Sequence, residues 1–567
     1  MRVPTTRLED LPAQGTSAGD EPAARAQPRF VRVLLLSAMF ALFAGPARAE
    51  DTNDPFARVR TGDAAGALST LADPYRKGAL DPWAARLYQD IRLEAGERAA
   101  LLEETKAAFP EPRSPLGQYL VARLADRKEI DAALQRALIV AADPEAVLLD
   151  QGWAALAADR LPFATGLLVR IRKGAAGREE PVLFEARVLE ANGDRREGAQ
   201  ALAAYAAQHL DAVDARRLWA QMLLDGNQGG DATQVLDEAL VRCRVPALLV
   251  SRASAALDLG DFATAKKLLD EVKDAGRPAL RAEALALRAR ILLAARDDAG
   301  AKAAADAAVK ICPSSPYAVR AQSRCLEVAG KLSEALARIE TAIDLAPTWA
   351  RLRVDRASIL VRSRLWKDAK KAVADARKRD PQNLDAALLV GFLDEEDGDW
   401  IGAEKVYRGV LKTNPDHVAA HRVLAGVLFA LAKLEQADAE AGWILDRLPK
   451  DSAAWFVRGR VALRQDHYDE ALAAFQKATD ADPTYALGFT GRGWTFEAQD
   501  KKDEAKKAYE AAVLADPTLP LPHRYLAELL EDLEDPSGAL TNYRAYLQLG
   551  GSDPDEDVKH SVERLSK

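Results

Sequence analysis

Apolar residues recur at helical spacing along most of the chain after residue 50, and no segment alternates apolar and polar residues as a half-buried β-strand does. The clearest segment runs from Ser452 to Tyr485, where the pattern predicts two helices joined by a short turn. The same pattern returns every 34 residues through the later part of the chain. The sequence therefore predicts an all-α chain built from repeated pairs of helices.

Three equivalent positions keep the same kind of residue from unit to unit, counted with Ser452 as offset 1 of its unit. Offset 32 is proline, at Pro313, Pro347, Pro381, Pro415, Pro449, Pro483 and Pro517. Offset 20 is alanine, at Ala265, Ala301, Ala335, Ala369, Ala403, Ala437, Ala471, Ala505 and Ala539. Offset 8 is small, at Ala253, Ala289, Ser323, Ala357, Gly391, Ala425, Gly459, Gly493 and Ala527.

Each of these positions has a physical reason. Small residues at offsets 8 and 20 let two antiparallel helices approach closely, while a large residue at offset 24, such as Phe475, fills the groove between units. Proline has no N–H to donate, so at offset 32 it ends one unit and sets the entry angle of the next. The spacing predicts nine regular units within residues 246–550.

The unit resembles the tetratricopeptide repeat, a helix–turn–helix unit of 34 residues. The matching residues are Trp455, Gly459, Tyr468, Ala471, Phe475, Ala478 and Pro483, at offsets 4, 8, 17, 20, 24, 27 and 32. This resemblance implies a right-handed superhelical solenoid whose first helices line a concave groove. It also implies that the groove holds a protein or peptide partner.

The resemblance assigns the groove to offsets 2, 5, 9, 12 and 13 of the first helices. The residues at such positions are Tyr317, Arg320, Arg324, Arg351, Arg362, Phe392, Arg422, Phe429, Phe456, Arg460, Arg464 and Trp494. Arginine beside aromatic residues is typical of binding hot spots, because both offer large contact areas. The groove hypothesis predicts that Arg320, Arg324, Arg460 and Arg464 form no internal ion pair. The alternative is that these side chains pack over neighbouring helices or are surface charge.

Some members of the family capture acidic C-terminal peptides with a two-carboxylate clamp of Lys and Asn. This chain mostly has Arg, Ser, Gly or aromatic residues at those positions, which argues against that role.

Two further segments flank the regular units. Residues 50–245 predict about five or six divergent helical hairpins continuous with the array, with a separate all-α domain as the alternative. Residues 551–567 predict a last helix with Val558, Val562 and Leu565 on one face. A solenoid needs such a polar-faced cap at its open end.

Residues 1–49 predict a leader followed by a secretory signal peptide. Arg29 and Arg32 precede an apolar run, and Ala47-Arg48-Ala49 offers a cleavage site before Glu50. The run is too short to span a bilayer, which disfavours the alternative of a membrane anchor. We therefore expect export to the periplasm, and translation starting near Val31 remains an alternative.

The net charge and the cysteine content disfavour nucleic-acid binding and a disulfide-stabilised fold. The full chain has a formal charge of −8, and the leader carries six basic and four acidic residues, which leaves −10 on the mature chain. So acidic a chain is a poor general nucleic-acid binder. Cys243, Cys312 and Cys325 do not make a disulfide framework, and free thiols are favoured over a Cys312–Cys325 bridge.

The motifs that suggest chemistry are weak. Gly15-Thr16-Ser17-Ala18-Gly19 matches a nucleophile elbow but lies in the leader. His417 and His421 would share a helical face, yet the pattern supplies no third metal ligand. The sequence therefore predicts a protein that is not an enzyme and needs no cofactor or metal.

The sequence favours an exported scaffold that binds a protein or peptide and serves an envelope or secretion complex. The alternative is a periplasmic component of a polysaccharide export or biosynthesis machine, contacting glycan through Trp494 and the Phe/Arg groove.

Overall fold

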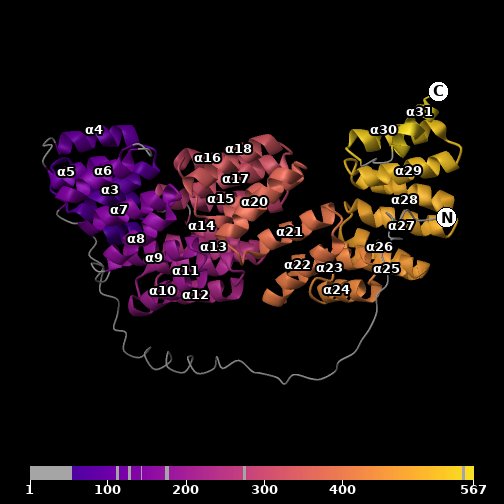
Figure 1. The fold of residues 1–567 in the computed structure, drawn as a ribbon, viewed down its shortest axis with the longest axis horizontal. Helices are drawn as coiled ribbons and strands as arrows, with labels where there is room; N and C mark the ends of the chain where they lie inside the picture. Colours follow the sequence, from indigo (N-terminus) through magenta and orange to yellow (C-terminus); the bar gives the residue numbers. More distant parts are fainter. Residues whose placement is uncertain are drawn as a thin grey trace, which may run out of the picture. The chain divides into compact units, whose positions relative to one another are not determined.

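In the computed structural model, every element of regular secondary structure among the described residues is an α-helix (Figure 1). The described residues are 54–109, 114–125, 129–141, 144–172, 178–272, 276–551 and 556–566. The predicted signal peptide and the Gly15–Gly19 motif lie outside them. No helix in the described part of the chain is both long and apolar enough to cross a membrane.

Successive helices pack in pairs. The first six pairs are α1 (Pro55–Thr61) with α2 (Ala64–Arg76), α3 (Pro82–Glu94) with α4 (Arg98–Ala108), α5 (Pro115–Arg123) with α6 (Ile130–Val140), α7 (Pro144–Ala157) with α8 (Leu161–Arg172), α9 (Glu179–Ala191) with α10 (Arg195–Gln208), and α11 (Val213–Asp225) with α12 (Gly229–Arg242).

The next helices are α13 (Pro246–Asp258) with α14 (Phe262–Val272), α15 (Pro278–Ala294) with α16 (Asp298–Ile311), α17 (Pro316–Val328) with α18 (Leu332–Leu345), α19 (Ala350–Arg362) with α20 (Trp366–Arg379), α21 (Leu384–Glu396) with α22 (Trp400–Thr413), α23 (Val418–Ala430) with α24 (Leu434–Arg447), α25 (Ser452–Arg464) with α26 (Tyr468–Ala481), α27 (Ala486–Ala498) with α28 (Lys502–Ala515), and α29 (Pro520–Asp532) with α30 (Pro536–Gln548). The chain ends with α31 (Asp557–Leu565). The predicted fold class, an all-α solenoid of helix–turn–helix repeats, is confirmed.

The helices form two compact units, which we call the N-terminal unit (residues 51–420) and the C-terminal unit (residues 421–567). The regular 34-residue repeats begin at residue 246. This boundary lies between α12 and α13, inside the N-terminal unit.

The turn inside each pair needs a left-handed residue at offset 15. Glycine takes this conformation freely, as Gly330 and Gly398 do with φ of 73° and 81°. Asp466 and Asp500 adopt it with φ of 60° and 59°, because a short polar side chain tolerates it better than a branched one. The turn therefore repeats even where glycine does not.

The small residue at offset 8 makes room for the large residue at offset 24 of the same unit. A Cβ atom added to Gly459 would stand 2.5 Å from Phe475 Cε1, and one added to Gly493 would stand 2.2 Å from Tyr509 Cε1. Offsets 8 and 20 also meet, because the Ser323 hydroxyl donates to the Ala335 carbonyl at 2.8 Å. The predicted close approach of the two helices is confirmed.

Replacing Gly493 with alanine should destabilise the C-terminal unit by about 1–3 kcal/mol, because the new methyl group overpacks the ring of Tyr509. Gly442, in α24, is the control, since a Cβ added there meets nothing within 4 Å. Alanine at Gly442 should stabilise the helix by about 0.5–1 kcal/mol. Urea unfolding of both variants checks the prediction, and equal effects would contradict the packing described here.

Segments far apart in the sequence also contact each other within the N-terminal unit. Arg277 pairs with Glu94 at 2.5 Å, and the Gly276 N–H donates to the Gly62 carbonyl at 2.8 Å. Arg195 likewise pairs with Asp380. These contacts join segments that are many helices apart in the sequence, so distant stretches of the solenoid pack against each other within this unit.

A buried charge network stabilises the start of the same unit. Asp150 of α7 accepts from Arg86 at 2.7 Å, from Arg123 at 2.6 Å and from the Tyr119 hydroxyl at 2.6 Å. Burial raises the pKa of the Asp150 carboxyl, but the charges of Arg123 and Arg86 outweigh burial and lower that pKa below its usual value. The carboxylate is therefore charged and fully partnered.

The C-terminal helix α31 covers the end of the last pair. Val558 is buried, and Val562 and Leu565 pack against the same apolar cluster as Tyr543 and Tyr546. The prediction that these three residues share a packing face is confirmed.

Candidate functional site

The predicted groove residues fall in both compact units. Tyr317, Arg320, Arg324, Arg351, Arg362 and Phe392 lie on first helices of the N-terminal unit, whereas Arg422, Phe429, Phe456, Arg460, Arg464 and Trp494 lie in the C-terminal unit. Their side chains have different partners in the two units.

In the N-terminal unit, Arg320 and Tyr317 meet at Trp349. The Arg320 guanidinium pairs with Asp355 at 2.5 Å and lies 5.6 Å from the Trp349 ring. The rings of Tyr317 and Trp349 have centroids 4.7 Å apart. The expectation that Arg320 forms no internal ion pair is wrong, because the acid at offset 6 of the next unit neutralises it.

Arg324 and Arg362 share one buried acid. Glu327 is only 2% exposed, and its carboxylate forms ion pairs with Arg324 at 2.7 Å and with Arg362 at 2.8 Å. The expectation of no ion pair is therefore also wrong for Arg324. Glu327 stands at offset 12, between an arginine of its own unit at offset 9 and one of the next unit at offset 13.

Arg351 also lies in an acidic environment. Burial lowers the pKa of its guanidinium, but Asp258 and Asp225 raise it, and the net pKa stands above its usual value. Phe392 lies apart from this group, with its ring 6.4 Å from that of Trp366. Arg320, Arg324 and Arg362 are therefore paired with acids of the chain itself, and acids of the chain also raise the pKa of Arg351.

The C-terminal unit gathers aromatic rings around a cation. The Arg460 guanidinium lies 3.9 Å from the ring centre of Phe429 and 5.7 Å from that of Phe456. Arg464 lies 5.9 Å from the same Phe429 ring. Trp494 lies 6.1 Å from Phe456. The structure thus brings five of the six residues predicted here into one cluster.

The sixth, Arg422, pairs with Asp451 instead. Two residues that the offsets did not select complete the cluster. Tyr485 lies 5.9 Å from Phe456, and Tyr525 lies 5.4 Å from Trp494. Tyr485 precedes α27 and Tyr525 occupies offset 6, so a rule restricted to five offsets misses both.

The electrostatics of Arg460 differ from those of the arginines in the N-terminal unit. Burial lowers the pKa of its guanidinium to about 10, and Tyr525 and Tyr485 oppose this only in part. The other group acting on this pKa is Arg464, another cation. Within the described part of the chain, Arg460 and Arg464 form no ion pair, as the groove hypothesis expects of them.

His417 and His421 contact different neighbours. His421 stacks on Trp443 with centroids 3.6 Å apart and contacts Glu440, and the His417 ring accepts from the Ala420 N–H at 3.2 Å. No three potential metal ligands gather anywhere in the described ranges. Cys243, Cys312 and Cys325 form no disulfide bond within the described residues, so the alternative Cys312–Cys325 bridge is not formed.

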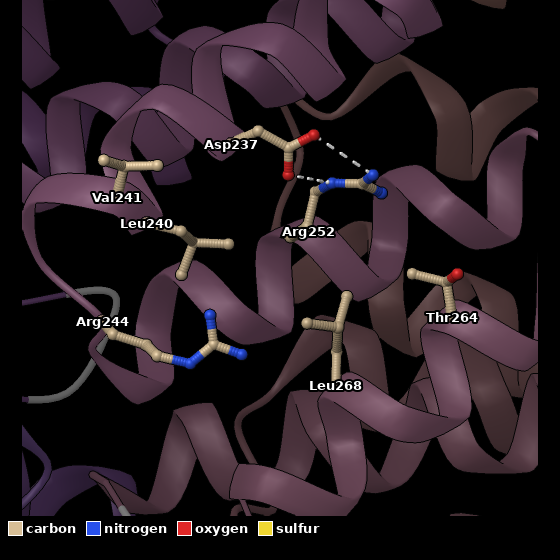
Figure 2. Close-up of a pocket in the computed structure, with 7 residues that line it drawn as sticks. All are labelled: Asp237, Leu240, Val241, Arg244, Arg252, Thr264 and Leu268. Carbon is tan, nitrogen blue, oxygen red and sulfur yellow. Dashed lines mark hydrogen bonds and ion pairs between the residues drawn. The ribbon is translucent and has the colours of Figure 1, made fainter.

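A cavity of ≈ 360 Å³ opens between α12 and α14 of the N-terminal unit (Figure 2). Leu240 and Leu268 form its apolar wall, and Arg252 pairs across it with Asp237 at 2.7 Å (Figure 2). Arg244 at its rim pairs with Glu271. Its basic groups are already neutralised by the chain, unlike Arg460.

Comparison with known proteins agrees with the repeat pattern. The model of the tetratricopeptide repeat family matches residues 250–316, 427–486 and 490–554. None of the curated protein sequences compared with this chain matches it significantly.

Several solved structures are similar in fold. A chain of the Cut9–Hcn1 hetero-tetramer of the APC/C has 14% identity and a TM-score of 0.48, covering 88% of this chain and 99% of that one. A thermophilic TPR protein of Thermus thermophilus has 21% identity and a TM-score of 0.30, covering 32% and 98%. A tetratricopeptide repeat protein from Parabacteroides merdae has 16% identity and a TM-score of 0.31, covering 51% and 99%.

At such low identities and TM-scores, these likenesses carry no argument about partners. The family assignment rests on the 34-residue period, the paired helices with their small residues at offsets 8 and 20, and the three matched regions. On this evidence the chain contains tetratricopeptide repeats in residues 250–316, 427–486 and 490–554.

Proposed function

We propose that the protein is an exported scaffold that binds a protein or peptide partner on the first helices of its C-terminal unit, for assembly of an envelope or secretion complex. Repeats of this family typically serve as non-catalytic scaffolds for protein interactions, which supports the partner class. We choose the C-terminal unit because Arg460 and Arg464 lie over Phe429 without an acid partner among the described residues.

The repeat provides an internal comparison for this observation. Phe429 and Arg464 stand three 34-residue steps after Glu327 and Arg362, so the two pairs occupy equivalent positions. Where the repeat that begins at Pro316 places the buried acid Glu327 at offset 12, the repeat that begins at Val418 places Phe429. Leu463 takes offset 12 in the unit of Arg460 itself. Both acids that could neutralise these arginines are thus replaced by apolar residues.

A partly buried cation without a carboxylate is unfavourable for the free protein, since desolvation opposes the charged form. A ligand that completes the cluster would recover this free energy on binding. Arginine among aromatic rings is also the composition of interaction hot spots. Arg460 and its aromatic neighbours therefore favour a binding role for this surface over a purely structural one.

The glycan alternative rests on Trp494, because an exposed indole ring can serve as a platform for sugar rings. In this structure Trp494 is only partly exposed, and Phe456 and Tyr525 contact its ring at centroid distances of 6.1 Å and 5.4 Å. This packing favours a peptide that reaches Arg460 over a sugar stacked on the indole.

Replacing Arg460 with methionine should leave the melting temperature unchanged or raise it, because methionine removes a desolvated charge and still packs on Phe429. The matched control is Arg320→Met in the N-terminal unit. It leaves Asp355 without its partner and should cost about 1–3 kcal/mol. Thermal unfolding of the two variants checks this. If Arg460→Met alone unfolded the protein early, the arginine would be part of the fold and the surface would be wrongly assigned.

Export is tested separately. Produced in a Gram-negative host, the protein should accumulate in the periplasm with Glu50 as its new N-terminus, because Ala47-Arg48-Ala49 follows an apolar run of signal-peptide length. N-terminal sequencing of the periplasmic fraction measures this. Recovery of the intact N-terminus, or of cytosolic protein only, would reject the export proposal and leave the binding proposal standing.

A further inference from the structure

The aromatic cluster of the C-terminal unit has the form of a cage around one cation. We define the Arg460 cage as Phe429, Phe456, Arg460, Tyr485 and Tyr525, contributed by α23, α25, α29 and the turn before α27. Phe429 and Phe456 are buried, whereas Arg460 is only partly buried and Arg464, at the rim, is exposed. Apolar walls thus surround a guanidinium that solvent still reaches.

The cage presents hydrogen-bond donors and contains no carboxylate among its five residues. Arg460 has five N–H donors, and neither it nor the hydroxyl groups of Tyr485 and Tyr525 has a hydrogen-bond partner among the residues described. Burial raises the pKa of Tyr485 to about 12, so its hydroxyl stays protonated and can donate. A bound group should therefore bring acceptor atoms and a negative charge.

Apolar side chains form the rest of the surface. The guanidinium carbon of Arg460 lies 3.9 Å from the ring centre of Phe429, and its N–H groups can still form directed hydrogen bonds with a ligand. A carboxylate matches that edge, because its two oxygens accept from guanidinium in a planar, bidentate geometry. A neighbouring aromatic or aliphatic side chain of the ligand would pack against the rings of the cage.

We propose that the Arg460 cage binds a peptide segment in which an Asp or Glu carboxylate stands beside an aromatic or aliphatic side chain. This inference rests on the proposed function and specifies its ligand. Charge complementarity argues for this occupant. Arg460 and Arg464 form no ion pair within the described residues, whereas acids of the chain neutralise Arg320, Arg324 and Arg362.

The repeat itself suggests the most specific variant. Phe429→Glu places at offset 12 the acid that Glu327 supplies three units earlier. The new carboxylate should form an internal ion pair with Arg460 or Arg464 and so compete with the ligand. Binding should then fall although both arginines remain. Because Phe429 is buried, the melting temperature of this variant must be checked. Arg460→Met, which removes the cation and keeps the packing, gives an independent test if Phe429→Glu does not fold.

The experiment is a selection of random dodecapeptides displayed on phage against the full chain from Glu50 onward. We expect enriched sequences that contain Asp or Glu next to Phe, Tyr, Leu or Ile. The Kd of the strongest synthetic peptide should rise about tenfold or more when its acid is changed to the amide, and equally in Arg460→Met. The Kd should stay unchanged in Lys507→Ala, an exposed second-helix control.

The outcomes separate this inference from the proposed function. Enriched peptides that lack acids, with binding still dependent on Arg460, would overturn the carboxylate assignment and leave the peptide-binding groove intact. Binding of an oligouronate in an Arg460-dependent manner, without peptide enrichment, would favour the glycan alternative and overturn the peptide ligand. Neither peptide nor oligouronate binding would reject both the inference and the groove.

Discussion

Ala471→Glu is expected to lower the free energy of unfolding by several kcal/mol. Ala471 stands at offset 20 of the clearest repeat and has no exposed surface, because α25 and α26 approach each other there. A glutamate at this position buries an unpaired carboxylate or forces the helices apart, and both are costly. Chemical unfolding monitored by circular dichroism measures the loss.

The control for this prediction lies on the same helix. Ala473 is exposed in α26, so Ala473→Glu should change stability by less than about 0.5 kcal/mol, although it adds the same charge with the same helix propensity. Equal melting temperatures for wild type and Ala471→Glu would show that the assigned register is wrong.

Asp150→Ala is expected to destabilise the N-terminal unit by about 3–5 kcal/mol. The substitution removes the acid that Arg86 and Arg123 share, and it leaves two almost fully buried guanidinium groups without that partner. Tyr119 also loses its acceptor. The exposed ion pair between Glu103 and Lys106 provides the comparison, and Glu103→Ala should cost less than about 1 kcal/mol.

The same carboxylate predicts a pH dependence with a definite sign. Because the folded-state pKa of Asp150 is lowered, the unfolded chain binds its proton first as the pH falls. The stabilisation by Asp150 is therefore complete above the unfolded pKa of about 3.9 and is lost as the pH falls through the lower folded pKa. Wild type and Asp150→Ala should converge in stability below that range. A constant difference at all pH values would contradict the charged network.

Much of the fold could be predicted because each repeat solves the same packing problem. Gly459 is small because Phe475 fills the adjacent space, and this relation is visible in the spacing alone. The terminal helix could be placed for the same reason, since Val558, Val562 and Leu565 recur at helical spacing.

The partners of the groove arginines could not be predicted from offsets taken singly. An ion pair such as Arg320 with Asp355 depends on two residues in adjacent units, and the contact of Arg217 with Glu283 joins first helices that are two pairs apart. The offsets alone therefore overestimate the number of arginines that have no acid partner.

One usable signal was nevertheless present in the sequence. Offset 12 carries Glu327 in one unit and Phe429 three units later, and this change distinguishes a neutralised arginine pair from one without an acid. Tyrosine at offset 24 and glutamate at offset 12 form a second such relation, since the Tyr543 hydroxyl donates to Glu531 at 3.1 Å. Comparing pairs of offsets across units extends the prediction from packing to electrostatics.

We propose above that the first helices of the C-terminal unit bind the partner. The most direct measurement is isothermal titration of the strongest selected peptide into three forms of the full chain: the wild type, Arg460→Met with Arg464→Ala, and Lys506→Ala with Lys507→Ala. If the surface is correctly assigned, we expect the Kd to rise about tenfold or more in the arginine variant and to stay unchanged in the lysine variant, since those lysines lie on the second helix α28. Loss of binding in the lysine variant with full binding in the arginine variant would contradict it.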